Sequence, residues 1–167
     1  MYSALLFFRL LHIFAGVLWV GGVVMIALFV SPTVRAIGPA GGQFMGHLLT
    51  KTRIAAYFPA VAGINVVAGL FLFWRAMKSG ADWAGTRSGM TYSIGALAAI
   101  IAFLVGGVLI GKSMGGIAKI LQTSGCPPQG EAAAQLAMYQ GRIQRGTNIV
   151  LPLLIIAVIA MAVGRYV

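Results

Sequence analysis

Four apolar runs, each long enough to cross a lipid bilayer as a helix, dominate this chain. They cover about residues 5–30, 54–74, 90–111 and 149–166 of the 167-residue sequence. A helix of about 20 mostly apolar residues crosses a hydrocarbon core of about 30 Å. Because only helices and closed barrels satisfy their backbone polar groups in lipid, the runs predict an all-α, integral membrane four-helix bundle. We expect residues 1–167 to form a single domain.

The composition favours the same class and argues against several others. Hydrophobic residues make up 60% of the chain and charged residues 8%, whereas soluble domains carry about 25% charged residues. With only two acidic residues, Asp82 and Glu131, we expect neither carboxylate-dyad catalysis nor a carboxylate-rich metal site. The net charge of +10 comes from bases that flank the apolar runs, where they bind lipid headgroups, so no nucleic-acid partner is expected. We identify no catalytic residue, and the sequence does not decide whether the protein is an enzyme.

Proline and glycine predict where the helices end. Ser31–Pro32 is expected to end the first helix, because the residue before proline disfavours the α region. From Gln43 a helical pattern resumes and runs through Lys51 and Arg53 into the second apolar run. Between residues 112 and 146 the pattern stays helical but becomes basic, interrupted only around Cys126, Pro127 and Pro128. This predicts long third and fourth helices that leave the bilayer as an extramembrane helical hairpin over about 112–146. The first run is also longer than the 7 to 15 apolar residues of a signal peptide, so we expect it to be a retained span.

His12 is the one histidine that lies inside an apolar run. On a helix it shares a face with Trp19, because positions three and four apart line the same stripe. An ionisable group that faces lipid at this depth costs about 3 kcal/mol, so His12 should face protein, a cavity or a ligand. His12 is therefore the candidate metal ligand, and Trp19 belongs to the same candidate cofactor site.

Depth along the helices decides which residues His12 can meet. His12 lies roughly 10 Å from the start of its helix at 1.5 Å per residue, in the layer near the termini. His47 begins the second helical stretch and belongs to the opposite side, so the two histidines are not expected to be axial ligands of one haem. Met90 and Met161 belong to the His12 layer, and either one could complete a His/Met axial pair.

Structural explanations compete with ligand binding at each of these positions. His12 could instead be hydrogen-bonded to Tyr92 or Ser93 in a packed interior. Asn65, in the middle of the second span, is expected to make a hydrogen bond between helices, worth about 1 kcal/mol or less. Small residues in the third helix predict close helix packing, since they let backbones approach. They form two sets, Gly95, Ala99, Ala102 and Gly106 on one face, and Gly107, Gly111 and Gly115 at GxxxG spacing.

The orientation in the membrane is predicted from the basic residues. Four spans place both termini and the loop between the second and third spans on one side. Cytoplasmic loops carry an excess of Lys and Arg, which places the hairpin in the cytoplasm and the termini outside. The hairpin side has Arg35, Lys51, Arg53, Lys112, Lys119, Arg142 and Arg145, and the other side has Arg9, Arg75, Lys78, Arg87 and Arg165.

The stretch His12-x6-Trp19-Val20-Gly21-Gly22 resembles the first helix of the copper-resistance D-type membrane proteins. It is also similar to the first helix of HemJ-type protoporphyrinogen oxidases, and this resemblance implies that His12 binds haem b. The later part of the chain, with its paired prolines and basic amphipathic helix, resembles small bacterial membrane proteins grouped with these families. HemJ-type enzymes also need a lysine near the start of a later helix, and the third helix here opens with Ser88, Gly89 and Met90 instead.

These observations predict a haem b-binding electron-transfer protein of the bacterial cytoplasmic membrane. His12 would be an axial ligand, and the electron partner would be a quinone or another protein. Arg pairs bidentately with carboxylates, so three arginines near the termini are candidate partners of the haem propionates: Arg9, Arg75 and Arg165. The alternative is a cofactor-free subunit that packs against a larger respiratory or photosynthetic complex or forms a homo-oligomer, as the small-residue faces would allow.

Overall fold

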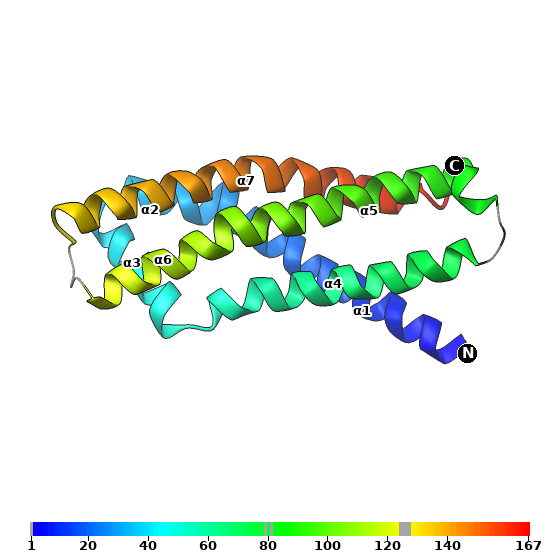
Figure 1. Cartoon of the computed structure of the whole chain (residues 1–167), viewed down its shortest axis with the longest axis horizontal. Coiled ribbons are helices and arrows are strands. Elements are labelled where there is room, and N and C mark those ends of the chain that lie inside the picture. The colour runs from blue at the N-terminus through cyan, green and yellow to red at the C-terminus, as the bar shows by residue number, and fades with distance from the viewer. Residues whose placement is uncertain (1, 79, 81, 124–127) are drawn as a thin grey trace.

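Four long helical segments run side by side along the long axis of the molecule (Figure 1). The computed structural model describes residues 2–78, 80, 82–123 and 128–167. Over these residues it contains helices and no β-strand. Four of its helical segments are long and apolar enough to cross a membrane. The predicted all-α bundle of membrane-spanning helices is confirmed.

The elements follow the chain in a simple up-and-down order. The first long segment consists of α1 (Tyr2–Met25), the π-helical η1 (Ile26–Val30) and α2 (Ser31–Ala36), after which the short α3 (Pro39–Lys51) leads into the second, α4 (Ile54–Met77). A single 3₁₀ turn, η2 (Trp83–Gly85), precedes the third, which consists of α5 (Arg87–Val105), the π-helical η3 (Gly106–Gly111) and α6 (Lys112–Thr123). The fourth is α7 (Glu131–Val163). Both termini and the α4–α5 connection lie at one end of the bundle, and the α6–α7 connection lies at the other (Figure 1).

The first helix does not end at Ser31–Pro32, and that prediction is wrong. The wider π-helical turn of η1 precedes this point, and the backbone N–H of Ser31 donates to the carbonyl of Ile26. Pro32 then falls in the first turn of α2, where a missing N–H and a fixed φ are tolerated. The helical segment therefore continues to Ala36, and the chain turns at Gly38, whose φ is 57°.

A break separates α3 from α4 where a continuous helix was predicted. Thr52 is extended, with φ −116° and ψ 169°. Its hydroxyl donates to the carbonyl of Leu48 and accepts from the backbone N–H of Ile54. Threonine side chains that bond the nearby backbone in this way compete with helix continuation.

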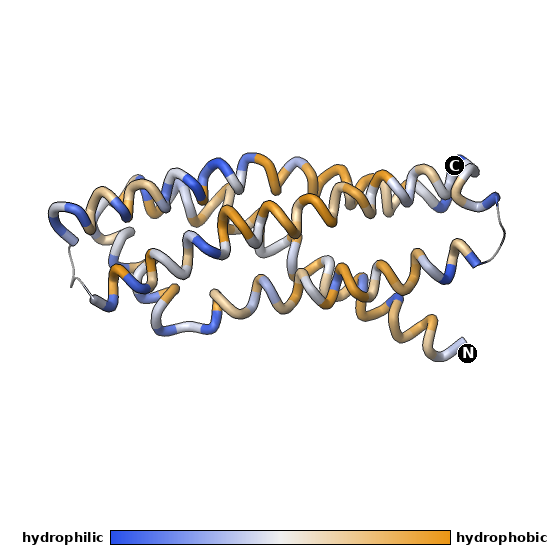
Figure 2. Tube along the Cα trace, in the orientation of Figure 1, coloured by the Kyte–Doolittle hydropathy of each residue, from blue (hydrophilic) through white to orange (hydrophobic). Residues whose placement is uncertain are grey.

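The long third and fourth helices are confirmed, because the third runs over 37 residues to Thr123 and the fourth over 33 residues from Glu131. The last part of the third helix, α6, packs on α7, and Ser113, Ile117 and Ile120 of α6 are buried. Hydrophilic residues concentrate at this end of the bundle (Figure 2). The position of this hairpin outside the bilayer stays a prediction, and Cys126 and Pro127 lie outside the described residues.

The bundle is built from two tightly packed helix pairs. α1 packs most extensively on α4, and α5 on α7, with fewer contacts between the pairs. Gly95 of α5 is buried against α7, which confirms close packing at the first small-residue face. Gly107 and Gly115 are exposed, and a Cβ on either would meet no atom within 4 Å. Within this chain the second set of glycines therefore does not pack closely against α7. The core between the pairs consists of Trp19, Val61, Ala62, Ala102, Val150 and Leu154.

Candidate functional site

His12 and Asn65 form a reciprocal pair of hydrogen bonds between α1 and α4. Nδ1 of His12 lies 2.9 Å from the backbone oxygen of Asn65. The side-chain amide of Asn65 in turn donates to the backbone oxygen of His12 over 2.8 Å. Asn65 is 6% exposed and His12 is half-buried. The predicted interhelical hydrogen bond of Asn65 is confirmed, and its partner is the backbone of the candidate ligand.

Glycine makes this close approach possible on both helices. A Cβ on Gly69 of α4 would lie 2.8 Å from Cε1 and 3.1 Å from Nδ1 of His12. A Cβ on Gly16 of α1 would lie 2.8 Å from the amide nitrogen of Asn65. These separations are too short for any larger residue without a shift of the ring or the amide. The imidazole is therefore held in one orientation by a backbone carbonyl and by the surface of a glycine.

The hydrogen bond also fixes which imidazole nitrogen is free. A backbone carbonyl can only accept, so Nδ1 carries the proton and neutral His12 has its lone pair on Nε2. Within the described part of the chain, Nε2 has no hydrogen-bond partner. Nε2 is thus the ring nitrogen whose lone pair no described residue engages.

Neither hydroxyl that the sequence offered as a partner of His12 takes that role. The Ser93 hydroxyl donates to the carbonyl of Gly89 over 2.7 Å. The ring of Tyr92 stacks on Trp83, with the ring centroids 6.2 Å apart. Both residues lie on α5, which has few contacts with α1. The acceptor on the neighbouring α4 is nearer in the bundle, and it satisfies Nδ1.

Five of the other predicted site residues lie at the same end of the bundle as His12, but no hydrogen bond gathers them around it; Trp19 lies deeper, in the bundle core. Met90 is 50% exposed. The terminal methyl of Met161 packs 3.2 Å from the position that a Cβ on Gly95 would take. Arg9 and Arg165 are exposed and Arg75 is half-buried. Their roles as a second axial ligand or as propionate partners stay predictions.

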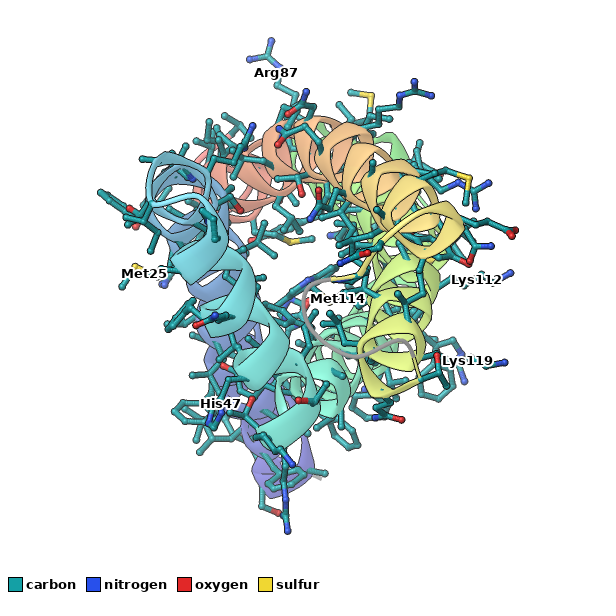
Figure 3. All side chains as sticks on the ribbon, turned by 90° about the vertical axis from the view of Figure 1, so that its left-hand side faces the viewer. Met25, His47, Arg87, Lys112, Met114 and Lys119 are labelled. Atoms are coloured by element: carbon teal, nitrogen blue, oxygen red, sulfur yellow. The ribbon has the colours of Figure 1, made fainter. Side chains whose placement is uncertain are left out.

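His47 lies apart from His12, as predicted. It is exposed on α3, at the hairpin end of the bundle (Figure 3). Over residues 2–78, 80, 82–123 and 128–167, no three His, Cys, Asp or Glu side chains come together as a metal site.

Sequence reasoning missed a chamber between the helix pairs, on the hairpin side of Trp19. Its volume is about 420 Å³, and its wall includes Trp19, Phe58, Phe103 and Met114. Met114 points toward the hollow between the helices (Figure 3). The signal in the sequence was the glycine run of the third helix, which we interpreted as a packing face and which instead lines this space. His12 is not part of the wall.

Comparison with known proteins gave no match, whether with family models, with curated proteins or with solved structures. The resemblance of the first helix to copper-resistance D-type and HemJ-type proteins therefore stays a prediction.

Proposed function

We propose that this chain is an integral membrane protein that binds haem b through Nε2 of His12 and takes part in electron transfer. The observation that supports the proposal is the orientation of the imidazole. A metal-ligating histidine almost always donates its other ring N–H to a carbonyl, carboxylate or water, which fixes the tautomer and the direction of the lone pair. His12 has this arrangement, with the Asn65 carbonyl as acceptor and Nε2 without a partner in the described chain.

The residues at this end of the bundle suit such a group in their chemistry. Haem b would supply one-electron chemistry, while the chain binds and orients it. His12 would provide one axial ligand, and Met90 and Met161 are the candidates for the other. Arg9, Arg75 and Arg165 are the candidates for pairing with the propionates, because Arg binds carboxylates in a bidentate fashion. A quinone or a partner protein would exchange the electrons.

A second candidate function is that of a cofactor-free subunit of a larger membrane complex. It is favoured by the two hydrogen bonds between His12 and Asn65, because these bonds have a structural role of their own. Each of the two hydrogen bonds runs from a side chain of one helix to a backbone oxygen of the other, at a point where both helices carry a glycine. Such a pair stabilises the helix packing whether or not a cofactor is bound. In this account Nε2 of His12 would have no ligand, and the apolar outer faces would contact lipid or neighbouring subunits.

Two histidine variants test the haem proposal. His12→Ala is expected to lose the Soret band completely while the protein still inserts, because four apolar spans do not depend on one imidazole for insertion. The matched control is His47→Ala, which changes an exposed histidine at the other end and should keep the full band. The measurement is the absorption spectrum per mole of purified protein. A Soret band retained in His12→Ala, or lost in His47→Ala, would refute the assignment of the ligand.

We also propose that the protein lies in the bacterial cytoplasmic membrane with the hairpin in the cytoplasm. The support is the larger number of Lys and Arg on the hairpin side, seven against five. Cys126, the single cysteine of the chain, belongs by sequence to the predicted hairpin over about 112–146. A membrane-impermeant maleimide should therefore label Cys126 in inverted vesicles and not in intact spheroplasts. Labelling of Cys126 in spheroplasts would show that the hairpin lies outside, opposite to the proposed orientation.

A further inference from the structure

The chamber is walled by aromatic rings and by a glycine-rich helical segment. Trp19 of α1 and Phe103 of α5 meet edge to face, with the ring centroids 6.4 Å apart, and Phe58 of α4 supplies a third ring. The π-helical η3 contributes Gly106, Gly107, Ile110 and Gly111 to the wall. Single π-helical turns frequently occur at functional sites. A volume of about 420 Å³ is within the range of small-molecule sites.

Two hydrogen-bond donors in this wall have no partner within the described part of the chain. Trp19 is only 5% exposed, and no acceptor bonds its indole N–H. The hydroxyl of Thr147 on α7 is likewise without a partner and is half-buried. None of the completely buried side-chain nitrogens and oxygens described lacks a partner, so both donor atoms keep some accessible surface. A hydrogen bond from either donor to an acceptor oxygen of a ligand would contribute about 0.5–1.5 kcal/mol.

The chamber wall excludes charged ligands. None of the described residues that line it is charged or a histidine. A charge placed there would be removed from water with no opposite charge to pair with it, which is expensive at membrane depth. The ligand should therefore be neutral and largely apolar, and the three aromatic rings favour a molecule with a flat ring of its own.

The chamber opens sideways between two of the helical segments. The exposed residues in its wall are Ala55 and Pro59 of α4, and Gly107, Gly111 and Gly115 of η3 and α6. All of them are small or lack a long side chain, so nothing bulky covers the opening. The surrounding helices are apolar enough to lie in a membrane. The opening therefore lies near the hairpin end of the predicted spans, where a ligand dissolved in the bilayer can reach it between the helices.

We infer that the chamber binds an isoprenoid quinone. The carbonyl oxygens of the ring accept from the indole of Trp19 and the hydroxyl of Thr147, the ring packs against the aromatic side chains, and the tail leaves through the lateral opening. This inference does not depend on haem binding at His12, because His12 is outside the chamber. An acyl ester of a lipid shares the carbonyl and the long chain but lacks the ring, so the experiment includes it.

Quenching of Trp19 fluorescence tests the inference directly. The protein carries Trp74→Phe and Trp83→Phe, which leaves Trp19 as the only indole, and is reconstituted in lipid nanodiscs. Decylubiquinone is the probe. Two competitors are compared with it: decylbenzene, which lacks the two carbonyls, and methyl laurate, which lacks the ring. We expect saturable quenching by decylubiquinone. Both competitors should bind at least about fivefold more weakly, because decylbenzene loses hydrogen bonds of about 1 kcal/mol each and methyl laurate loses the contacts of the ring. Quenching without saturation would mean that no site exists, and equal competition by methyl laurate would make it an acyl-chain site; either result overturns the proposal.

Three further variants localise the binding to the chamber. A leucine at Gly115 projects from the chamber wall, and since a Cβ there meets no atom within 4 Å, the helix packing should survive. Gly115→Leu should abolish binding, while Gly21→Leu, also with open space but outside the wall, should not change it. Thr147→Val should weaken decylubiquinone about fivefold and leave decylbenzene unchanged. Unaltered binding in Gly115→Leu, with the melting temperature preserved, would overturn the assignment to this chamber.

Discussion

Gly95→Leu is expected to lower the melting temperature of the detergent-solubilised protein by about 10 °C, corresponding to about 3 kcal/mol from overpacking. Gly95 is buried where α5 crosses α7. A Cβ on Gly95 would lie 3.0 Å from Cβ of Ala160 and 3.4 Å from the carbonyl oxygen of Ala157. Because small residues carry much of helix association in lipid, a leucine here would force the most extensive helix pair apart.

The matched control for this variant is Gly21→Leu. Gly21 is exposed on α1, and a Cβ there would meet nothing within 4 Å. The same substitution should therefore change the melting temperature by no more than about 1 °C, since surface substitutions stay within about 0.5 kcal/mol. Thermal melting followed by circular dichroism or by size exclusion gives both values. An equal fall in the two variants would show that helix propensity or lipid contact, and not the α5–α7 contact, sets the stability.

Gly69→Leu is expected to weaken haem binding by at least about tenfold although His12 itself is unchanged. A Cβ on Gly69 would lie 2.8 Å from Cε1 of the imidazole, so the ring must leave its position and lose the carbonyl of Asn65. An imidazole without this acceptor no longer has a fixed lone-pair direction, and outer-shell changes of this kind reduce metal affinity by 10- to 100-fold. The dissociation constant for haem b, measured by titration of the Soret band, should therefore rise by at least about tenfold.

Two neighbouring variants make this expectation specific. Gly63→Leu lies on the same helix with open space at the Cβ, and it should keep the band. Asn65→Leu removes the amide that donates to His12 but keeps the backbone carbonyl that accepts from Nδ1, so it should also keep the band. It should lose only about 1 kcal/mol of stability. A full band in Gly69→Leu would mean that the position of the ring observed here is not the one that binds haem.

The architecture was predictable because length and hydropathy decide it. Four apolar runs of about 20 residues leave few alternatives in lipid, and the basic pattern beyond residue 112 predicted the long hairpin. The helix ends were less predictable, because they depend on local bonding that composition does not reveal. The π-helical turn before Pro32 lets the first helix continue where an end was predicted, and the hydroxyl of Thr52 accompanies a break where a continuous helix was predicted.

The candidate site was predictable only in part. The cost of an ionisable group in lipid pointed to His12, and the same argument predicted a partner for Asn65. That they bond to each other depends on the relative rotation of α1 and α4, which glycines at two positions permit. The chamber was missed because a glycine repeat looks the same in sequence whether it faces a helix or an empty space. Gly107 and Gly115 face such a space.

The reduced minus oxidised absorption spectrum of the wild-type protein, after reconstitution with equimolar haem b, tests the central claim most directly. The claim is that Nε2 of His12, held free by the hydrogen bond from Nδ1 to Asn65, binds haem iron. We predict a saturable Soret band and the α band of haem b at one haem per chain. A folded protein that stays colourless, or that takes up haem without saturation, would contradict the account and leave the cofactor-free subunit as the function.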